Sequence, residues 1–140
     1  MPDGFLPSSV WKSKPPLSFI PKCEACGLYK TCNSPKMKIS GDGEKGILII
    51  GETPGSSEDR LDQHFVGKSG KYLSRILRSL KIDMRKDCWL TNALICRPET
   101  KDTPKPKIIE HCRPNVLQAI KELNPRIIIL AGEGPFGSLM

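Results

Sequence analysis

One short apolar run constrains this chain more than any other feature: Ile47-Leu48-Ile49-Ile50 leads directly into Gly51-Glu52-Thr53-Pro54-Gly55. Four consecutive aliphatic residues before a glycine- and proline-containing turn are typical of a strand buried on both faces, as in parallel sheets. A loop that directly follows such a strand lies at the carboxyl edge of the sheet, where open α/β sheets bind ligands. The sequence therefore predicts a strand at 47–50 and a functional loop at 51–55, with an ordinary tight turn as the alternative for the loop.

The segments that follow alternate between helix and strand patterns. Between Ser69 and Leu80 the apolar residues recur at helical spacing, at Leu73, Ile76, Leu77 and Leu80. Strands are predicted at 89–95 and 126–130, with a helix at 107–123 that Pro114 should interrupt or restart. This alternation predicts an α/β fold, a three-layer α/β/α sandwich with a central parallel sheet.

The N-terminal segment differs in composition from the rest. Residues 1–22 contain five prolines, which predicts an extended N-terminal arm preceding an α/β domain at 23–140. The apolar runs are too short to span a bilayer, and the N-terminus lacks the unbroken apolar core of a secretory signal. We therefore expect a soluble, intracellular protein of the cytoplasm with no membrane partner.

Charge is distributed unevenly along the chain. The formal net charge is +7, yet residues 46–59 carry −3 and residues 60–87 carry +5. An excess of positive charge attracts polyanions and releases their counterions, so nucleic acid is a reasonable partner. A solvated basic surface with no partner explains the same numbers. A membrane surface would call for a basic amphipathic helix, which the sequence does not suggest.

Six cysteines suggest metal chemistry, since a reducing compartment disfavours disulfides. A C-x-x-C pair occupies 23–26, and Cys96 and Cys112 are each followed by Arg-Pro. Four thiolates would suit an iron-sulfur cluster or a zinc ion. The alternative is a redox pair at 23–26 beside two ordinary buried cysteines. Cys32 could substitute as a ligand, whereas Cys88, at a strand start, suits the core.

A second glycine-rich stretch, Gly67-Lys68-Ser69, suggests a phosphate loop, but the match fails. The first glycine of that motif should stand at position 62, which is Asp62, and no strand runs directly into the loop. Nucleotide hydrolysis is therefore rejected. Instead, the polar and aromatic residues near the carboxyl edge are expected to converge there with Glu52, namely Glu58, Asp59, Phe65 and Asn92.

Three linked motifs carry a family resemblance. They are Gly51-Glu52-Thr53-Pro54-Gly55-Ser56-Ser57-Glu58-Asp59, then Phe65-Val66-Gly67-Lys68-Ser69-Gly70, then Thr91-Asn92 followed by Cys96-Arg97-Pro98. In order and spacing, from Cys23 to Ala131, the chain resembles the uracil-DNA glycosylase superfamily, specifically its iron-sulfur family 4 branch. The resemblance implies removal of uracil from DNA by hydrolysis of the N-glycosidic bond.

The resemblance also implies roles for individual residues. Glu52 would be catalytic, because a carboxylate can stabilise positive charge on the sugar or orient water. The substrate-binding positions would be Thr53, Glu58, Phe65 and Asn92. Phe65 offers a face for a flipped pyrimidine, and the Asn92 amide matches N3–H and O4 of uracil. A structural [4Fe-4S] cluster, with zinc as the alternative, would be held by Cys23, Cys26, Cys96 and Cys112. The partner would be uracil-containing DNA, bound by a monomer.

The chain departs from the family at two places. The family usually has Gly-Arg-Pro before the phenylalanine, whereas Asp62-Gln63-His64 stands here, so specificity could differ. A C-terminal loop containing histidine has no counterpart before Met140, so the sheet is expected to be incomplete and the chain to be an N-terminal portion of the domain. A non-catalytic DNA-binding module and a zinc-bound structural module remain alternatives.

Overall fold

The computed structural model describes residues 23–99 and 105–140, so the predicted arm at 1–22 lies outside the described residues. Its elements, in chain order, are the 3₁₀ helix η1 (Leu28–Lys30), β1 (Ile47–Gly51), α2 (Ser56–Leu61), α3 (Lys68–Ser79), α4 (Met84–Asp87), β2 (Cys88–Asn92), α5 (Pro106–Leu123), β3 (Ile127–Leu130) and α6 (Glu133–Leu139). Within the described residues, no helix has the length and apolar character that crossing a membrane requires.

The three strands form a parallel sheet in the order β2-β1-β3. Ile47 stands opposite Cys88 on one side and Ile127 on the other, so the strands start in step. At the carboxyl edge, Gly51 stands opposite Asn92. The predicted functional loop and Asn92 are therefore neighbours because of strand register alone.

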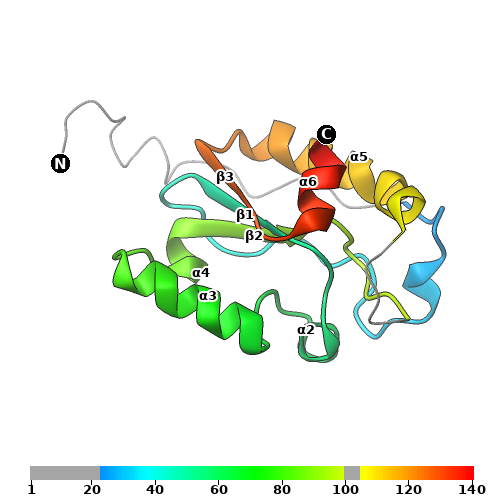
Figure 1. The fold of residues 1–140 in the computed structure, drawn as a ribbon, viewed down its shortest axis with the longest axis horizontal. Helices are drawn as coiled ribbons and strands as arrows, with labels where there is room; N and C mark the ends of the chain where they lie inside the picture. The colour runs from blue at the N-terminus through cyan, green and yellow to red at the C-terminus, as the bar shows by residue number, and fades with distance from the viewer. Residues whose placement is uncertain (1–22, 100–104) are drawn as a thin grey trace.

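Helices cover both faces of the sheet (Figure 1). Ile47, Ile49 and Leu90 pack with Leu77 of α3 and Met84 of α4. Side chains of successive strand residues point to opposite faces. The alternate residues Leu48, Ile50 and Trp89 accordingly pack with Val116 and Leu123 of α5, with Leu139 of α6 beside them. The predicted three-layer α/β/α architecture with a parallel sheet is confirmed.

Pro114 does not interrupt the second long helix, so the predicted break is wrong. α5 is continuous from Pro106 to Leu123 with Pro114 inside it. An internal proline removes one helical hydrogen bond and disfavours the helix by about 3 kcal/mol. Packing offsets this loss, because residues on both sides of Pro114, including Cys112 and Val116, are buried.

Other predicted elements also differ from the structure in their boundaries or in their buried face. β2 ends at Asn92 rather than at 95, after which the N–H groups of Ala93 and Leu94 donate to the carbonyls of Gly51 and Glu52. Of the apolar residues predicted to share one face of α3, Leu77 is buried, whereas Ile76 and Leu80, the C-cap of this helix, are exposed. Part of the predicted apolar face is therefore not covered by the sheet that the described residues form.

Candidate active site

A cavity of about 470 Å³ lies at the carboxyl edge of the sheet. It is bounded by the β1 loop, the loop before α3, the first turn of α3 and the end of β2. All five side chains predicted to bind or process the substrate line it, namely Glu52, Thr53, Glu58, Phe65 and Asn92. Lys68, Ser69 and Ala131 are also in its wall. The structure thus brings one carboxylate pair, one carboxamide and one aromatic ring together at the predicted place.

Asn92 is nearly buried beside the cavity, with 4% of its surface exposed. Its Nδ2 lies 3.3 Å from Nδ1 of His64, and Nε2 of His64 lies 2.9 Å from the carbonyl oxygen of Lys38. Its Oδ1 lies over Gly51, where a Cβ would come within 2.4 Å of it. Glycine at position 51 therefore gives the Asn92 amide its space.

Phe65 is held in an unusual backbone conformation. Its φ is +56°, in the left-handed region that a bulky side chain rarely adopts. The Arg85 guanidinium donates to its carbonyl oxygen at 3.2 Å. A Cβ at Gly70 would stand 2.1 Å from that same oxygen, so only glycine fits against this backbone. Such strain is retained where the surrounding structure fixes it, and here it places an aromatic ring in the cavity wall.

Glu58 connects the two loops that form the cavity walls. One of its oxygens accepts from the N–H of Gly55 at 3.1 Å. The other accepts from the N–H groups of Val66 at 2.8 Å and Gly67 at 2.6 Å. Gly55 is the N-cap of α2, so Glu58 also caps its own helix. With three backbone donors on one carboxylate, Glu58 orders the walls as well as lining them.

Glu52 follows β1 directly and packs against the start of α6. A Cβ at Gly134 would lie 2.9 Å from Cγ of Glu52, and one at Gly132 would lie 3.1 Å from Oε2. Its backbone carbonyl accepts from Leu94 at 3.1 Å. The carboxylate is thereby restricted to the cavity edge between β1 and α6.

Asp59 does not join this group, and the expectation that it converges on the cavity is wrong. Its side chain is buried and accepts from the backbone N–H groups of Asn33 at 3.0 Å and Ser34 at 2.8 Å. Neighbouring residues on α2 therefore face different ways. Glu58 faces the cavity, while Asp59 ties α2 to the cysteine-containing N-terminal loop.

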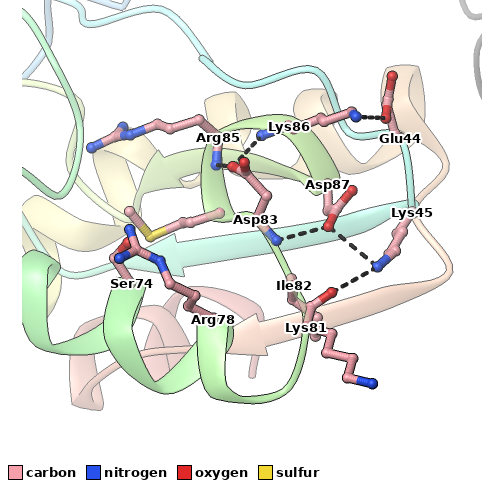
Figure 2. A pocket seen from close by; sticks show the side chains of 11 residues that line it. Glu44, Lys45, Ser74, Arg78, Lys81, Ile82, Asp83, Arg85, Lys86 and Asp87 are labelled. Atoms are coloured by element: carbon pink, nitrogen blue, oxygen red, sulfur yellow. Dashed lines mark hydrogen bonds and ion pairs between the residues drawn. The ribbon is translucent and has the colours of Figure 1, made fainter.

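The positive charge of residues 60–87 gathers around α3 and α4. A groove of about 600 Å³ runs from Phe65 between these helices and is lined by Lys71, Arg75, Arg78 and Arg85. Among the ion pairs found between described residues, none includes these four side chains. Figure 2 shows the neighbouring pocket beside it, where Asp83 accepts from the backbone of α4 and Asp87 binds Lys45. The nearby carboxylates are thus engaged elsewhere, which leaves the groove basic.

Cys96 and Cys112 are buried in an apolar cluster with Leu94, Ile95 and Ile109, separate from the residues that pack on the sheet. The sulfur of Cys96 accepts from the N–H of Lys36 at 3.2 Å, and that of Cys112 from Nδ2 of Asn115 at 3.6 Å. Cys23 donates to the carbonyl oxygen of His111 at 3.3 Å. We call the group Cys23, Cys26, Cys32, Cys96 and Cys112 the cysteine cluster. All are free thiols.

The pKa values of Cys96 and Cys112 show that the cysteines of the cluster lie near one another. Burial raises the pKa of Cys96 to about 12, with the Lys36 N–H opposing it and Cys32, Cys112 and Cys26 adding to it. Burial also raises the pKa of Cys112, again with neighbouring cysteines contributing. Within residues 23–99 and 105–140, no three or more His, Cys, Asp or Glu side chains are arranged so that they could hold a metal ion. Cys88 belongs to the sheet core instead, as predicted.

Sequence reasoning missed the role of His64, which was singled out only as a departure from the family motif. It is 1% exposed and hydrogen-bonded at both ring nitrogens. The only local signal for this role in the sequence was the position of the His64 imidazole directly before Phe65. Its partners, Lys38 and Asn92, lie 26 and 28 residues away in the sequence, so no local pattern identifies them.

The fold and the cavity define a class, an α/β/α domain with a cavity at the carboxyl ends of its strands, the edge at which open α/β sheets bind ligands. The family follows from comparison with known proteins. Residues 39–139 match the model of the uracil DNA glycosylase superfamily, and the chain belongs to this superfamily.

Curated relatives specify the branch to which the chain is similar. It is 39% identical over 115 residues to the type-4 uracil-DNA glycosylase of Pyrobaculum aerophilum, a match covering 81% of this chain and 57% of the relative. The type-4 enzymes of Archaeoglobus fulgidus and Thermotoga maritima are each 33% identical, over 81% of this chain and 56% and 58% of their own lengths. The chain thus spans a little over half the length of these relatives.

Proposed function

We propose that this protein removes uracil from DNA by hydrolysing the N-glycosidic bond. One observation carries the proposal: Glu52, Phe65 and Asn92, from three separate segments, line the same cavity at the carboxyl edge of the sheet. An enzyme that works on a base must first take it out of the stack into such a pocket. Membership of the superfamily and similarity to type-4 enzymes support the same reaction.

Each of the three side chains has a part in this proposal. Phe65 stacks on the flipped pyrimidine, and the Asn92 amide pairs with N3–H and O4 of uracil. Glu52 stabilises positive charge that develops on the sugar, or orients the attacking water. Thr53 and Glu58 complete the walls, with Glu58 holding the loops that shape them.

The basic groove between α3 and α4 supports DNA as the partner. It begins at Phe65, so a strand whose base enters the cavity could place its phosphates along Arg75, Arg78 and Arg85. Contacts of this kind position nucleic acid without reading its sequence. The groove also favours the second candidate function, a DNA-binding module that does not cleave the glycosidic bond.

We also propose that Cys23, Cys26, Cys96 and Cys112 hold a [4Fe-4S] cluster, with zinc as the alternative. The donor set fits the group: soft sulfur ligands lie close enough to influence one another, and N–H groups point at two of them. These four cysteines come from the N-terminal loop, the segment after β2 and α5, so a cluster held by them would cross-link these three segments. Cys32 is near enough to Cys96 to compete as a ligand.

The test of the activity is release of uracil from a single-stranded oligonucleotide, detected as alkali-sensitive strand cleavage. Asn92→Ala should lower release by about 100-fold or more, while DNA affinity stays close to that of the wild type because phosphate contacts are separate from base reading. Asn33→Ala is the matched control, since this exposed asparagine is not in the cavity wall.

No uracil release by the cluster-loaded wild-type protein would overturn the glycosylase proposal. Salt-sensitive DNA binding without base loss would then favour the binding module. Equal loss of release and DNA affinity in Asn92→Ala would contradict the base-reading role of Asn92.

A further inference from the structure

His64 is the residue at which this chain departs from the family motif, and it is buried next to the candidate base-reading residue. It is absent from the cavity wall, yet its Nδ1 lies 3.3 Å from Nδ2 of Asn92. Its ring is tilted by 44° to that of Phe65 at 6.4 Å between centroids. A residue in this position can affect the substrate only through the neighbours that it holds.

The proton positions on His64 follow from its partners. The carbonyl oxygen of Lys38 can only accept a hydrogen bond, so Nε2 of His64, 2.9 Å away, must carry a hydrogen. In a neutral ring, Nδ1 is then a bare acceptor. The group of Asn92 that faces Nδ1 must therefore be the donor, Nδ2. This places Oδ1 on the side of Gly51 and Phe65, as found.

The charges around His64 favour this neutral ring. Burial lowers its pKa most, and the positive charge of Arg85 lowers it further. The Lys38 carbonyl and the carboxylates of Asp62 and Glu58 oppose these effects, and the net change is downward from 6.5. At neutral pH the ring is therefore uncharged, with Nδ1 available to accept.

We propose that His64 is a positioning residue that fixes the amide orientation of Asn92, so that the cavity accepts uracil and rejects cytosine. The inference rests on the proposed function. It adds that a residue outside the cavity sets the base preference.

The chemistry of the two bases makes amide orientation decisive. Uracil presents a donor at N3–H beside an acceptor at O4, whereas cytosine presents an acceptor at N3 beside a donor at N4. With one Nδ2 hydrogen donated to His64, Asn92 keeps its Oδ1 and its other Nδ2 hydrogen for the base, the pattern that complements uracil. Turning the amide by 180° would complement cytosine but would place Oδ1 against the lone pair of Nδ1.

Protonation of His64 would reverse the orientation that the side-chain amide of Asn92 prefers. A hydrogen on Nδ1 would confront the Nδ2–H of Asn92, and the amide would relax by turning its oxygen towards the ring. Uracil recognition should accordingly weaken as the pH falls through the pKa of His64. A merely structural role for His64 would not predict a change in base preference.

The first test is independent of activity. With ¹⁵N-labelled histidine, NMR of the wild-type protein should report a neutral ring at pH 7.5 with the hydrogen on Nε2 and a bare Nδ1. A ring protonated at Nδ1 at this pH, as a cation or as the other tautomer, would overturn the proposal.

The second test compares release of uracil and cytosine from otherwise identical oligonucleotides. His64→Phe removes the acceptor, and the ratio of uracil to cytosine release should fall on the order of 10- to 100-fold, with loss of the acidic decline in uracil release. His64→Gln restores a carbonyl acceptor and should recover part of the ratio.

An unchanged ratio and pH profile in folded His64→Phe would overturn the positioning role. If the wild type releases neither base, the glycosylase proposal fails instead, and the NMR experiment still decides whether His64 accepts from Asn92.

Discussion

The cavity and the cysteine cluster bury polar atoms in opposite ways. Around the cavity, the chain supplies partners to its own polar groups: Glu58 receives three backbone N–H bonds, and Asn92, His64 and Lys38 form a continuous chain of hydrogen bonds. In the cysteine cluster, the buried sulfurs of Cys96 and Cys112 accept longer contacts from N–H groups, among them Lys36 at 3.2 Å and Asn115 at 3.6 Å.

This difference indicates where each region obtains its stability. A carboxylate that accepts three backbone N–H bonds is organised before any ligand arrives, which is what a recognition site requires. Buried thiols make only weak hydrogen bonds, and burial raises the pKa of both. Under the proposed function, a metal cluster would supply the bonds that the chain itself does not supply there.

The largest expected effect tests whether the cysteine cluster depends on a bound metal for its stability. Cys112→Ala should abolish bound iron and the brown visible absorbance, and should lower the free energy of unfolding by several kcal/mol, because ligand binding is coupled to folding. Iron analysis, the visible spectrum and thermal unfolding measure these effects.

Cys88→Ala is the matched control for Cys112→Ala, because Cys88 is buried in the sheet core away from the cluster. It should keep its iron and lose about 1 kcal/mol through the small cavity created. A colourless wild-type protein containing zinc would select the alternative metal. Unchanged metal content in Cys112→Ala would contradict its role as a ligand.

The next prediction tests whether the hydrogen bonds of Glu58 hold the loops that form the cavity walls. Glu58→Ala leaves the N–H groups of Gly55, Val66 and Gly67 without their acceptor, and the free energy of unfolding should fall by about 3 kcal/mol. Glu58→Gln retains one acceptor oxygen and should lose less. Denaturant titration measures both variants. A change under about 0.5 kcal/mol in Glu58→Ala would mean that the loops are held by other contacts.

A smaller effect concerns the space around Asn92. Gly51→Ala would place Cβ 2.4 Å from Oδ1 of Asn92 and 2.9 Å from Cζ of Phe65, so both must move. The stability should fall by about 1–3 kcal/mol, and uracil release should be lost. Gly137→Ala is the control, because its added Cβ meets no atom within 4 Å apart from its chain neighbours and the backbone of its own helix. If Gly51→Ala behaves like Gly137→Ala, Asn92 is not confined by the backbone of β1.

The contrast between the two regions also explains what the sequence could predict. The apolar run at 47–50 and the helical spacing around Leu77 are local patterns, and they identify β1 and α3 within one or two residues. The position of Asn92 beside Gly51 follows from the register of parallel strands. These features depend on a few neighbouring residues and on general rules of sheet topology.

Features that depend on distant partners could not be predicted in this way. Pro114 is tolerated because α5 is buried on both sides of it, and local propensity says nothing of that burial. Asp59 turns away from the cavity to bind the backbone at Asn33 and Ser34, some 25 residues earlier. His64 acquires its role only when Lys38 and Asn92 are brought to either side of its ring.

The smallest expected effect is the pH dependence that His64 gives to stability. Its pKa is lowered in the folded protein, so between that value and 6.5 the unfolded chain binds more protons than the folded one. Stability should therefore rise with pH across this window and become independent of His64 above 6.5, by at most about 1.4 kcal/mol for each unit by which the pKa is lowered. Denaturant titrations of the wild type and His64→Phe between pH 5 and 8, roughly the range over which histidine titrates, isolate the contribution of His64 as the difference between the two curves. Parallel curves would mean that the His64 ring takes up a proton in the folded protein as readily as in water. Burial would then not keep the ring neutral, and Nδ1 would not remain the bare acceptor that the proposed orientation of Asn92 requires.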